Sequence, residues 1–119
     1  MLRAFDLVEE NERAVVLFTR GRAFELEPNG VGSTGHWIIA ERRSDELDRV
    51  IIYHRRDDMN ANDVYIASFD GLSPSPPHPD DPNRWRKSVI HFSGWRHVSE
   101  TEADWEAFGG TKQNGRFYL

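Results

Sequence analysis

Arg49-Val50-Ile51-Ile52-Tyr53-His54-Arg55 decides the fold, because it is the most strongly apolar strand-like run in the chain and has a charged residue at each end. β-Branched and aromatic side chains pack well on a pleated sheet. A short run that stays apolar at successive positions is typical of a strand covered on both faces. We therefore expect residues 49–55 to form a central strand.

Further strands are predicted on either side of this run. Residues 64–69 alternate in character and stop at the turn signal Asp70-Gly71, so we expect them to form a hairpin with residues 49–55. Arg20-Gly21 suits a tight turn between two earlier strands, and Gly94 suits a bulge in a later one. The remaining predicted strands cover residues 14–19, 22–26, 36–40, 87–95 and 117–119, and residues 44–48 are expected to make a helical turn.

One short helix is predicted near the C-terminus. Ser99-Glu100-Thr101-Glu102 matches the capping-box pattern, and Gly109-Gly110 stands where a helix would stop. A helix over residues 100–108 places Trp105 and Phe108 on one face, which can dock onto the sheet. We predict a mainly β (α+β) fold: a small mixed or antiparallel β-barrel of six to seven strands with one short C-terminal helix, in a single domain over residues 1–119.

Composition excludes several classes of function. The chain has 119 residues, no Cys and a net charge of −5. Without Cys, a disulfide framework, a thiolate nucleophile and a Cys-based metal site are excluded. No apolar stretch approaches the roughly 18 to 20 residues that span a bilayer, so we expect a cytoplasmic protein without membrane contact. The negative net charge opposes nonspecific coating of nucleic acid. Cationic residues are nevertheless frequent in the middle of the chain, where they form either a local basic face or scattered charges at strand edges.

Two groups of residues carry possible chemistry without a decisive pattern. Gly30-Val31-Gly32-Ser33-Thr34-Gly35 matches the dinucleotide-binding spacing, but the following residues predict a strand and not the required helix. We expect either a mobile loop or a ligand-contacting loop, in which Ser33, Thr34 and His36 hydrogen-bond a base or phosphate. The histidines are interpreted either as ordinary strand or edge residues or as a general acid/base pair for RNA cleavage. We expect no cofactor and no metal site. The four histidines outside the proline-rich segment are His36, His54, His91 and His97.

Aromatic residues give the sharpest prediction of a binding site. Indole and phenol rings near strand ends either fill a small core or form walls between which a base stacks. The predicted pocket has Trp37, Tyr53 and Trp95 as its walls. Four arginines are expected to position the phosphates of the ligand: Arg42, Arg43, Arg55 and Arg56.

The succession of three strands resembles that of the PUA-like superfamily, especially its EVE and ASCH branches. The resemblance covers about residues 36–95, and its segments are Asp48-Arg49-Val50-Ile51-Ile52-Tyr53, Val64-Tyr65-Ile66-Ala67-Ser68-Phe69 and Lys87-Ser88-Val89-Ile90-His91-Phe92. It implies a small β-barrel with flanking helices that recognises RNA or modified DNA bases in a pocket at the barrel mouth. Tyr53 and Trp37 are the pocket walls that the resemblance implies.

Three functions are therefore weighed. The first is a noncatalytic module that recognises a base, a nucleotide or a modified nucleic acid in an aromatic pocket. The second is a protein-interaction or assembly domain that uses the proline-rich segment 73–82 or a strand edge. The third is a histidine-dependent nuclease. Catalysis has no positive support, because no nucleophile with an adjacent base matches a known motif.

Overall fold

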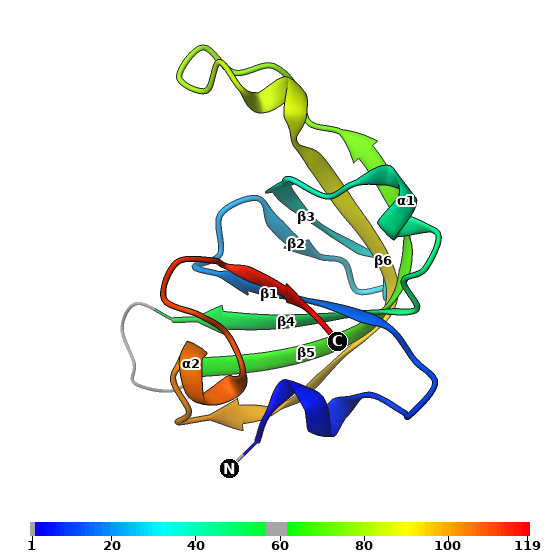
Figure 1. Ribbon diagram of the computed structural model, residues 1–119, viewed down its shortest axis with the longest axis vertical. Coiled ribbons are helices and arrows are strands. Elements are labelled where there is room, and N and C mark those ends of the chain that lie inside the picture. The colour runs from blue at the N-terminus through cyan, green and yellow to red at the C-terminus, as the bar shows by residue number, and fades with distance from the viewer. Residues whose placement is uncertain (1, 57–61) are drawn as a thin grey trace.

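β4 (Arg49–Arg55) lies inside one seven-stranded sheet in the computed structural model, which describes residues 2–56 and 62–119 (Figure 1). The order of strands across the sheet is β2-β3-β6-β5-β4-β1-β7. The mainly β prediction is confirmed. The other strands are β1 (Ala14–Thr19), β2 (Phe24–Leu26), β3 (Gly32–Trp37), β5 (Asn62–Pro74), β6 (Ser88–Thr101) and β7 (Arg116–Tyr118), and the helical elements are η1 (Ala4–Leu7), α1 (Glu41–Ser44), η2 (Arg84–Arg86) and α2 (Trp105–Phe108).

β4 is an interior strand, as its sequence predicts. It pairs in parallel with β1 and antiparallel with β5, so the expected hairpin with residues 64–69 is confirmed. Its successive residues Val50, Ile51, Ile52 and Tyr53 are all fully buried. Since neighbouring side chains on a strand point to opposite faces, both faces of β4 must be covered.

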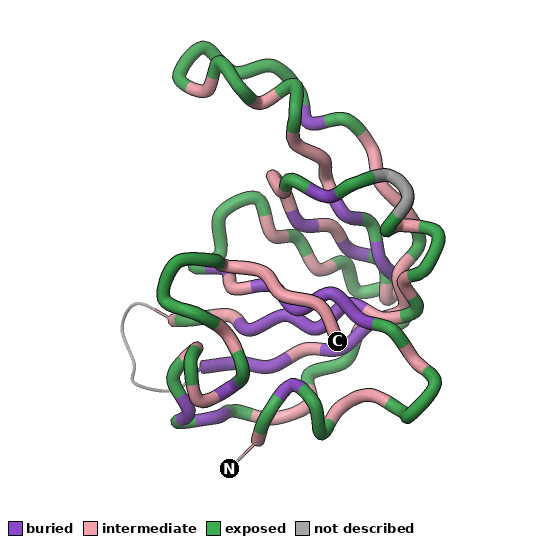
Figure 2. The backbone as a smooth tube through the Cα atoms, in the orientation of Figure 1, coloured by how far each residue is buried: buried purple, intermediate pink, exposed green. Residues whose placement is uncertain are grey.

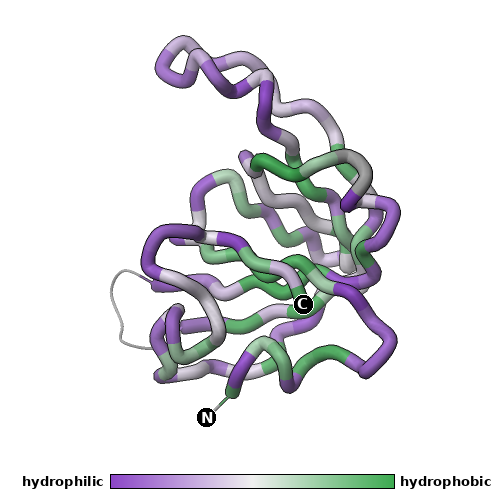
Figure 3. Tube along the Cα trace, viewed as in Figure 1, coloured by the Kyte–Doolittle hydropathy of each residue, from purple (hydrophilic) through white to green (hydrophobic). Residues whose placement is uncertain are grey.

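Two hydrophobic clusters cover these two faces. Ile51 and Tyr53 belong to a cluster closed by η1 and α2, whereas Val50 and Ile52 belong to a cluster closed by the curled β2, β3 and β6 side of the sheet. The buried segments concentrate along β1, β4 and β5, where the chain is also most hydrophobic (Figures 2 and 3). The sheet therefore carries a separate core on each side.

The long strands β5 and β6 connect the two halves of the sheet. The first part of β5 pairs with β4, while the first part of β6 pairs with β3. The register between β5 and β6 shifts at several places, one of them opposite Gly94, whose φ is +62°. Such irregularities increase local twist and bending. The predicted bulge at Gly94 is therefore confirmed. Because of this bend, residues of β5 and β6 contribute to the hydrophobic clusters on both sides of the sheet.

The predicted barrel closure is not observed. In the described residues the sheet has two edge strands, β2 and β7, so we describe an open, curled sheet. The predicted tight hairpin at Arg20-Gly21 is also wrong, because β1 pairs with β4 and β7 while β2 pairs with β3. β1 lies in the interior of the sheet because its apolar side chains are buried there, whereas β2 at the edge of the sheet is only partly buried.

Three predicted boundaries also differ from the structure. β6 continues to Thr101, so the helix starts later than predicted: it is α2, with the Asp104 carboxylate accepting from the Ala107 amide. Residues 32–35 belong to β3 and not to a loop, since a side chain on Gly32 would meet the Phe92 ring at 2.4 Å and glycine permits this close pairing. The helical turn lies at α1, slightly before residues 44–48. No helix of the described residues is long and apolar enough to cross a bilayer.

Replacing Phe108 by Ala is expected to lower the free energy of unfolding by about 3–5 kcal/mol, because it leaves a cavity beneath α2. Phe108 is fully buried, whereas Phe5 is 73% exposed. Phe5→Ala is therefore the matched control and should change stability by less than about 0.5 kcal/mol. Chemical denaturation of both variants measures the difference, and equal losses would contradict this assignment of the core.

Candidate functional site

A hollow of about 500 Å³ lies beside α2, where two parallel strands end. Phe18 and Arg20 come from the end of β1 and the residue after it, and Arg55 is the last residue of β4. Trp105 begins α2, and residues 111–115, which lead into β7, complete the rim. Its size lies within the usual range of about 300–1,000 Å³ for small-molecule sites.

Parallel pairing explains why two arginines meet at this hollow. β1 and β4 run in register from Ala14 opposite Arg49 to Thr19 opposite His54. Each strand thus ends at the same edge of the sheet, and the residues that follow the last pair are Arg20 and Arg55. The carboxyl ends of parallel strands are a common place for ligands in sheet proteins.

Aromatic side chains form the wall of the hollow. The Trp105 ring lies 5.6 Å from the Phe18 ring, at an interplanar angle of 65°. Trp105 is held in place by its indole N–H, which donates to the Asn114 carbonyl at 2.9 Å. Gly110 is required beneath it, because a Cβ there would stand 2.1 Å from the indole ring. The ring is therefore fixed and still partly exposed beside the hollow.

Cations outnumber carboxylates at the rim. Arg20, Arg55 and Lys112 line the hollow, against the two acids Asp104 and Glu106. The Arg20 guanidinium lies 5.5 Å from the centre of the Phe18 ring, in reach of a cation–π interaction. The Asp104 carboxylate is engaged by the backbone of α2. The rim therefore has a local excess of positive charge on a protein whose net charge is negative.

Tyr53 lies beneath this wall and does not face the hollow. Its ring stacks on Phe18 at 5.6 Å and contacts Trp105 and Phe108, and its hydroxyl donates to the Ala103 carbonyl at 2.7 Å. The ring is fully buried, and this burial raises the pKa of the Tyr53 hydroxyl. Tyr53 thus supports the aromatic wall from behind.

Trp37 and Trp95 lie on the opposite side of the sheet from Tyr53. Both pack against the cluster of Val50 and Ile52. The Trp37 indole N–H donates to the Thr34 hydroxyl at 3.3 Å, and that of Trp95 donates to the Glu27 carbonyl at 2.9 Å. Tyr53 therefore packs into one core cluster while Trp37 and Trp95 pack against the other, so the three rings of the predicted pocket lie on two sides of the sheet.

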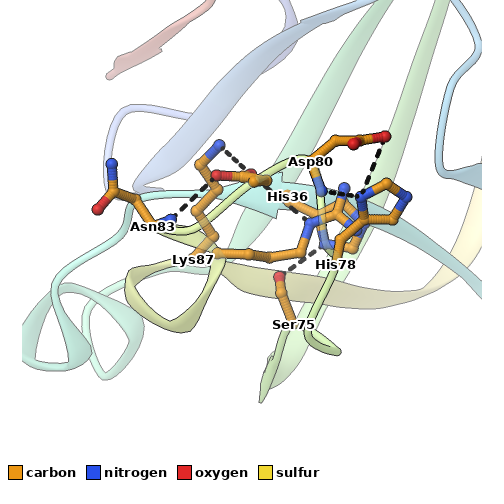
Figure 4. Close-up of polar contacts among 8 residues, drawn as sticks. His36, Ser75, His78, Asp80, Asn83 and Lys87 are labelled. Carbon is orange, nitrogen blue, oxygen red and sulfur yellow. Dashed lines mark hydrogen bonds and ion pairs between the residues drawn. The ribbon is translucent and has the colours of Figure 1, made fainter.

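The polar residues predicted with these rings also separate. Thr34 is buried, and Ser33 lines a small hollow of about 220 Å³ beside His91. His36 instead reaches the base of the arm, which we define as the proline-rich segment 74–87. There its Nδ1 lies 2.7 Å from the Ser75 hydroxyl (Figure 4).

Burial and positive neighbours lower the pKa of His36 and so favour its neutral form. Desolvation is the main cause that lowers the pKa of His36, and the nearby charges of Arg84 and Lys87 lower it further. Asp81 opposes them, but its carboxylate accepts from the Lys87 ammonium at 2.8 Å and has a lowered pKa for that reason. The contact of the His36 ring with the Ser75 hydroxyl joins β3 to the base of the arm.

Of the four predicted phosphate-positioning arginines, one lines the hollow, namely Arg55. Arg56 forms ion pairs with Asp63 at 3.1 Å and with Glu100 at 2.9 Å. The Arg43 guanidinium lies 4.4 Å from the centre of the Tyr118 ring. The side chain of Arg42 lies outside the described part of the structure. The three arginines whose side chains are described thus have different surroundings.

The remaining histidines contact separate partners. His91 Nε2 lies 2.6 Å from the Ser73 hydroxyl, and His97 Nε2 lies 2.8 Å from the Asp63 carboxylate. The ring of His54 lies 5.4 Å from that of Phe24. Within residues 2–56 and 62–119, no group of three His, Asp or Glu side chains is placed to hold a metal ion. The described contacts of His36, His54, His91 and His97 are with different partners, and a histidine-dependent nuclease stays a prediction.

Sequence reasoning missed Phe18, Arg20 and Lys112 as site residues. Phe18 and Arg20 approach Arg55 because β1 pairs in parallel with β4, whereas Lys112 comes from the segment that leads into β7. The signal for the parallel pairing was the unbroken apolar character of both runs, since parallel strands are buried on both faces. Trp105 was expected to dock onto the sheet, and it does so while also lining the hollow.

The chain matches no protein-family model, no curated protein and no solved structure. The resemblance to PUA-like domains therefore stays a prediction.

Lowering the pH is expected to destabilise the wild-type protein more than the His36→Gln variant. The folded state lowers the pKa of His36, so the unfolded chain binds this proton more readily and the free energy of unfolding falls as pH drops through about 6.5. Urea unfolding at about pH 8 and pH 5 measures this difference. Equal losses in both proteins would contradict it, and an NMR titration of the His36 ring provides the control.

Proposed function

We propose that this protein is a noncatalytic module that binds a base or nucleotide in the hollow beside α2. The observation that carries the proposal is the partly exposed Trp105 ring, fixed at the wall of a hollow whose rim holds Arg20, Arg55 and Lys112. Base stacking on an aromatic side chain contributes about 1–3 kcal/mol and tolerates any base. Arginine and lysine then contact the phosphate and orient the ligand.

The size and charge of the hollow support a small, anionic ligand. Its volume of about 500 Å³ accommodates a planar ring system together with a phosphate. The excess of cations is local, while the protein carries a net charge of −5. Long-range repulsion therefore disfavours broad coating of a nucleic acid, and a single nucleotide or a short, unpaired segment suits the site better than a duplex.

The proposed site lies at a different place from the predicted pocket but binds the ligand by the same two interactions. Trp105, and not Trp37 or Trp95, stacks on the base, and Arg55 contacts the phosphate as predicted. A pocket beside a curled β-sheet agrees with the resemblance to PUA-like domains, which rests on the strand pattern alone. We propose the cytoplasm as the place of action, on the sequence features named above.

Titration with purine and pyrimidine nucleoside monophosphates, and with short single-stranded RNA and DNA with plain or modified bases, tests the proposal at low salt. Binding is expected to quench the fluorescence of Trp105 and to weaken as salt rises, because the rim contacts phosphate. Arg55→Ala should weaken binding about fivefold to tenfold, which corresponds to about 1–1.4 kcal/mol for one charge-assisted contact.

Arg43→Ala is the matched control, since this arginine is also exposed but lies against Tyr118 and outside the hollow. It should leave the affinity unchanged. The same loss of affinity in both variants would show that net charge alone attracts the ligand. A wild-type protein that binds none of these probes more tightly than about 1 mM, a free energy of only about −4 kcal/mol, would overturn the proposal.

A further inference from the structure

Two exposed aromatic side chains lie at opposite ends of the molecule. Trp85 is 78% exposed on the arm, and Phe5 is 73% exposed on η1. The arm projects from one end of the long axis, whereas η1 lies at the other end (Figure 1). Large exposed aromatic side chains are enriched at sites of protein contact, where Trp and Arg contribute most of the binding energy.

The arm presents Trp85 on a constrained support. Its prolines fix their own φ angles, and the Ser75 amide donates to the Lys87 carbonyl at 3.1 Å where the arm leaves the sheet. The Asp81 carboxylate binds the Lys87 ammonium at 2.8 Å and lies 3.7 Å from the Arg84 guanidinium, so one carboxylate contacts two cations of the arm. A constrained segment loses less conformational entropy when it docks.

The returning side of the arm, between the turn at residues 79–80 and the base at Lys87, is both aromatic and cationic. The sequence Arg84-Trp85-Arg86 forms η2, and the Arg86 guanidinium lies 5.8 Å from the centre of the Trp85 ring. Arg86 is exposed, whereas Arg84 and Lys87 on either side of this pair both lie next to the Asp81 carboxylate. A partner surface for Trp85 and Arg86 needs an apolar hollow with acidic side chains around it.

Such a hollow exists at the other end of the same chain. A space of about 470 Å³ is lined by the apolar residues Phe5, Val8 and Leu119. Its remaining lining residues are acidic, namely Glu9, Glu10 and Glu12. Glu12 is held by Arg49 at 2.6 Å, while Glu9 and Glu10 are exposed. We call this the N-terminal hollow.

We propose that the arm of one copy of this protein docks into the N-terminal hollow of a second copy. Trp85 would pack on Phe5, Val8 and Leu119, and Arg86 would face Glu9 and Glu10. Charge complementarity between two parts of one sequence is the argument for a second copy as the occupant. The arm cannot reach the hollow of its own chain, because the two lie at opposite ends (Figure 1).

This contact joins two different surfaces and is therefore heterologous. The resulting pair keeps one free arm at one end and one free hollow at the other, so association continues into chains or closes into a ring. The contact involves one short stretch of the arm and one hollow, and small interfaces of this kind are weak. Association is expected to rise with protein concentration and to fall with salt, which screens the charged pairs.

Mixing two variants tests the proposal directly. Trp85→Ala keeps an intact hollow, and Phe5→Ala keeps an intact arm; both side chains are exposed, so both variants should fold. By sedimentation equilibrium at protein concentrations up to about 1 mM, a range suited to weak interfaces, the wild type should form oligomers of increasing mass. Each variant alone should stay monomeric, whereas an equal mixture should form a dimer that grows no further.

Val31→Ala is the control for loss of an exposed apolar side chain, since Val31 is 37% exposed and lies outside both surfaces. It should associate like the wild type. A monomeric wild type at the highest concentration would overturn the proposal, as would a mixture that stays monomeric or single variants that still associate. Nucleotide titrations of the same variants separate this proposal from the proposed function, because neither Phe5 nor Trp85 lines the hollow beside α2.

Discussion

The parallel pairing of β1 with β4 is the interaction on which the rest of the structure depends. The two strands are apolar at successive positions and are buried on both faces, so each needs a core on either side. Hydrogen bonds next to the first pair hold the register: the Arg13 amide donates to the Asp48 carboxylate at 2.9 Å, and the Asp48 amide donates to the Arg13 carbonyl at 2.8 Å. Both cores and the open, curled sheet follow from this arrangement.

The same pairing builds the candidate site. Two strands that run in one direction bring Arg20 and Arg55 to a common edge, where α2 places Trp105 over Phe18. Tyr53 ties this wall to the interior through its ring contacts and its bond to the Ala103 carbonyl. The rigid core thus positions a partly exposed aromatic surface beside cations, as a binding site for a planar, anionic ligand requires.

The two ends of the molecule have opposite character because different constraints shape them. At one end, β5 continues beyond its pairing with β4 as far as Pro74, and the prolines between β5 and β6 cannot donate to a sheet ladder, so the chain forms the arm. At the other end, η1 covers the core with Ala4 and leaves Phe5 exposed next to a run of acidic residues. One end therefore carries an exposed aromatic side chain beside an exposed arginine, and the other an apolar hollow with an acidic rim.

By itself the sequence determined the mainly β class, the strand at residues 49–55 with its hairpin partner, and the bulge at Gly94. These features rest on local properties: side-chain shape, alternation, and the φ angle of glycine. Only the tertiary structure decided that β1 pairs with β4 and not with β2, that β6 runs through the predicted helix start, and that Tyr53 lies across the sheet from Trp37 and Trp95. Strand partners and cavity walls depend on contacts between distant residues, and which pairing buries the most apolar surface is a property of the whole chain, not of any one segment.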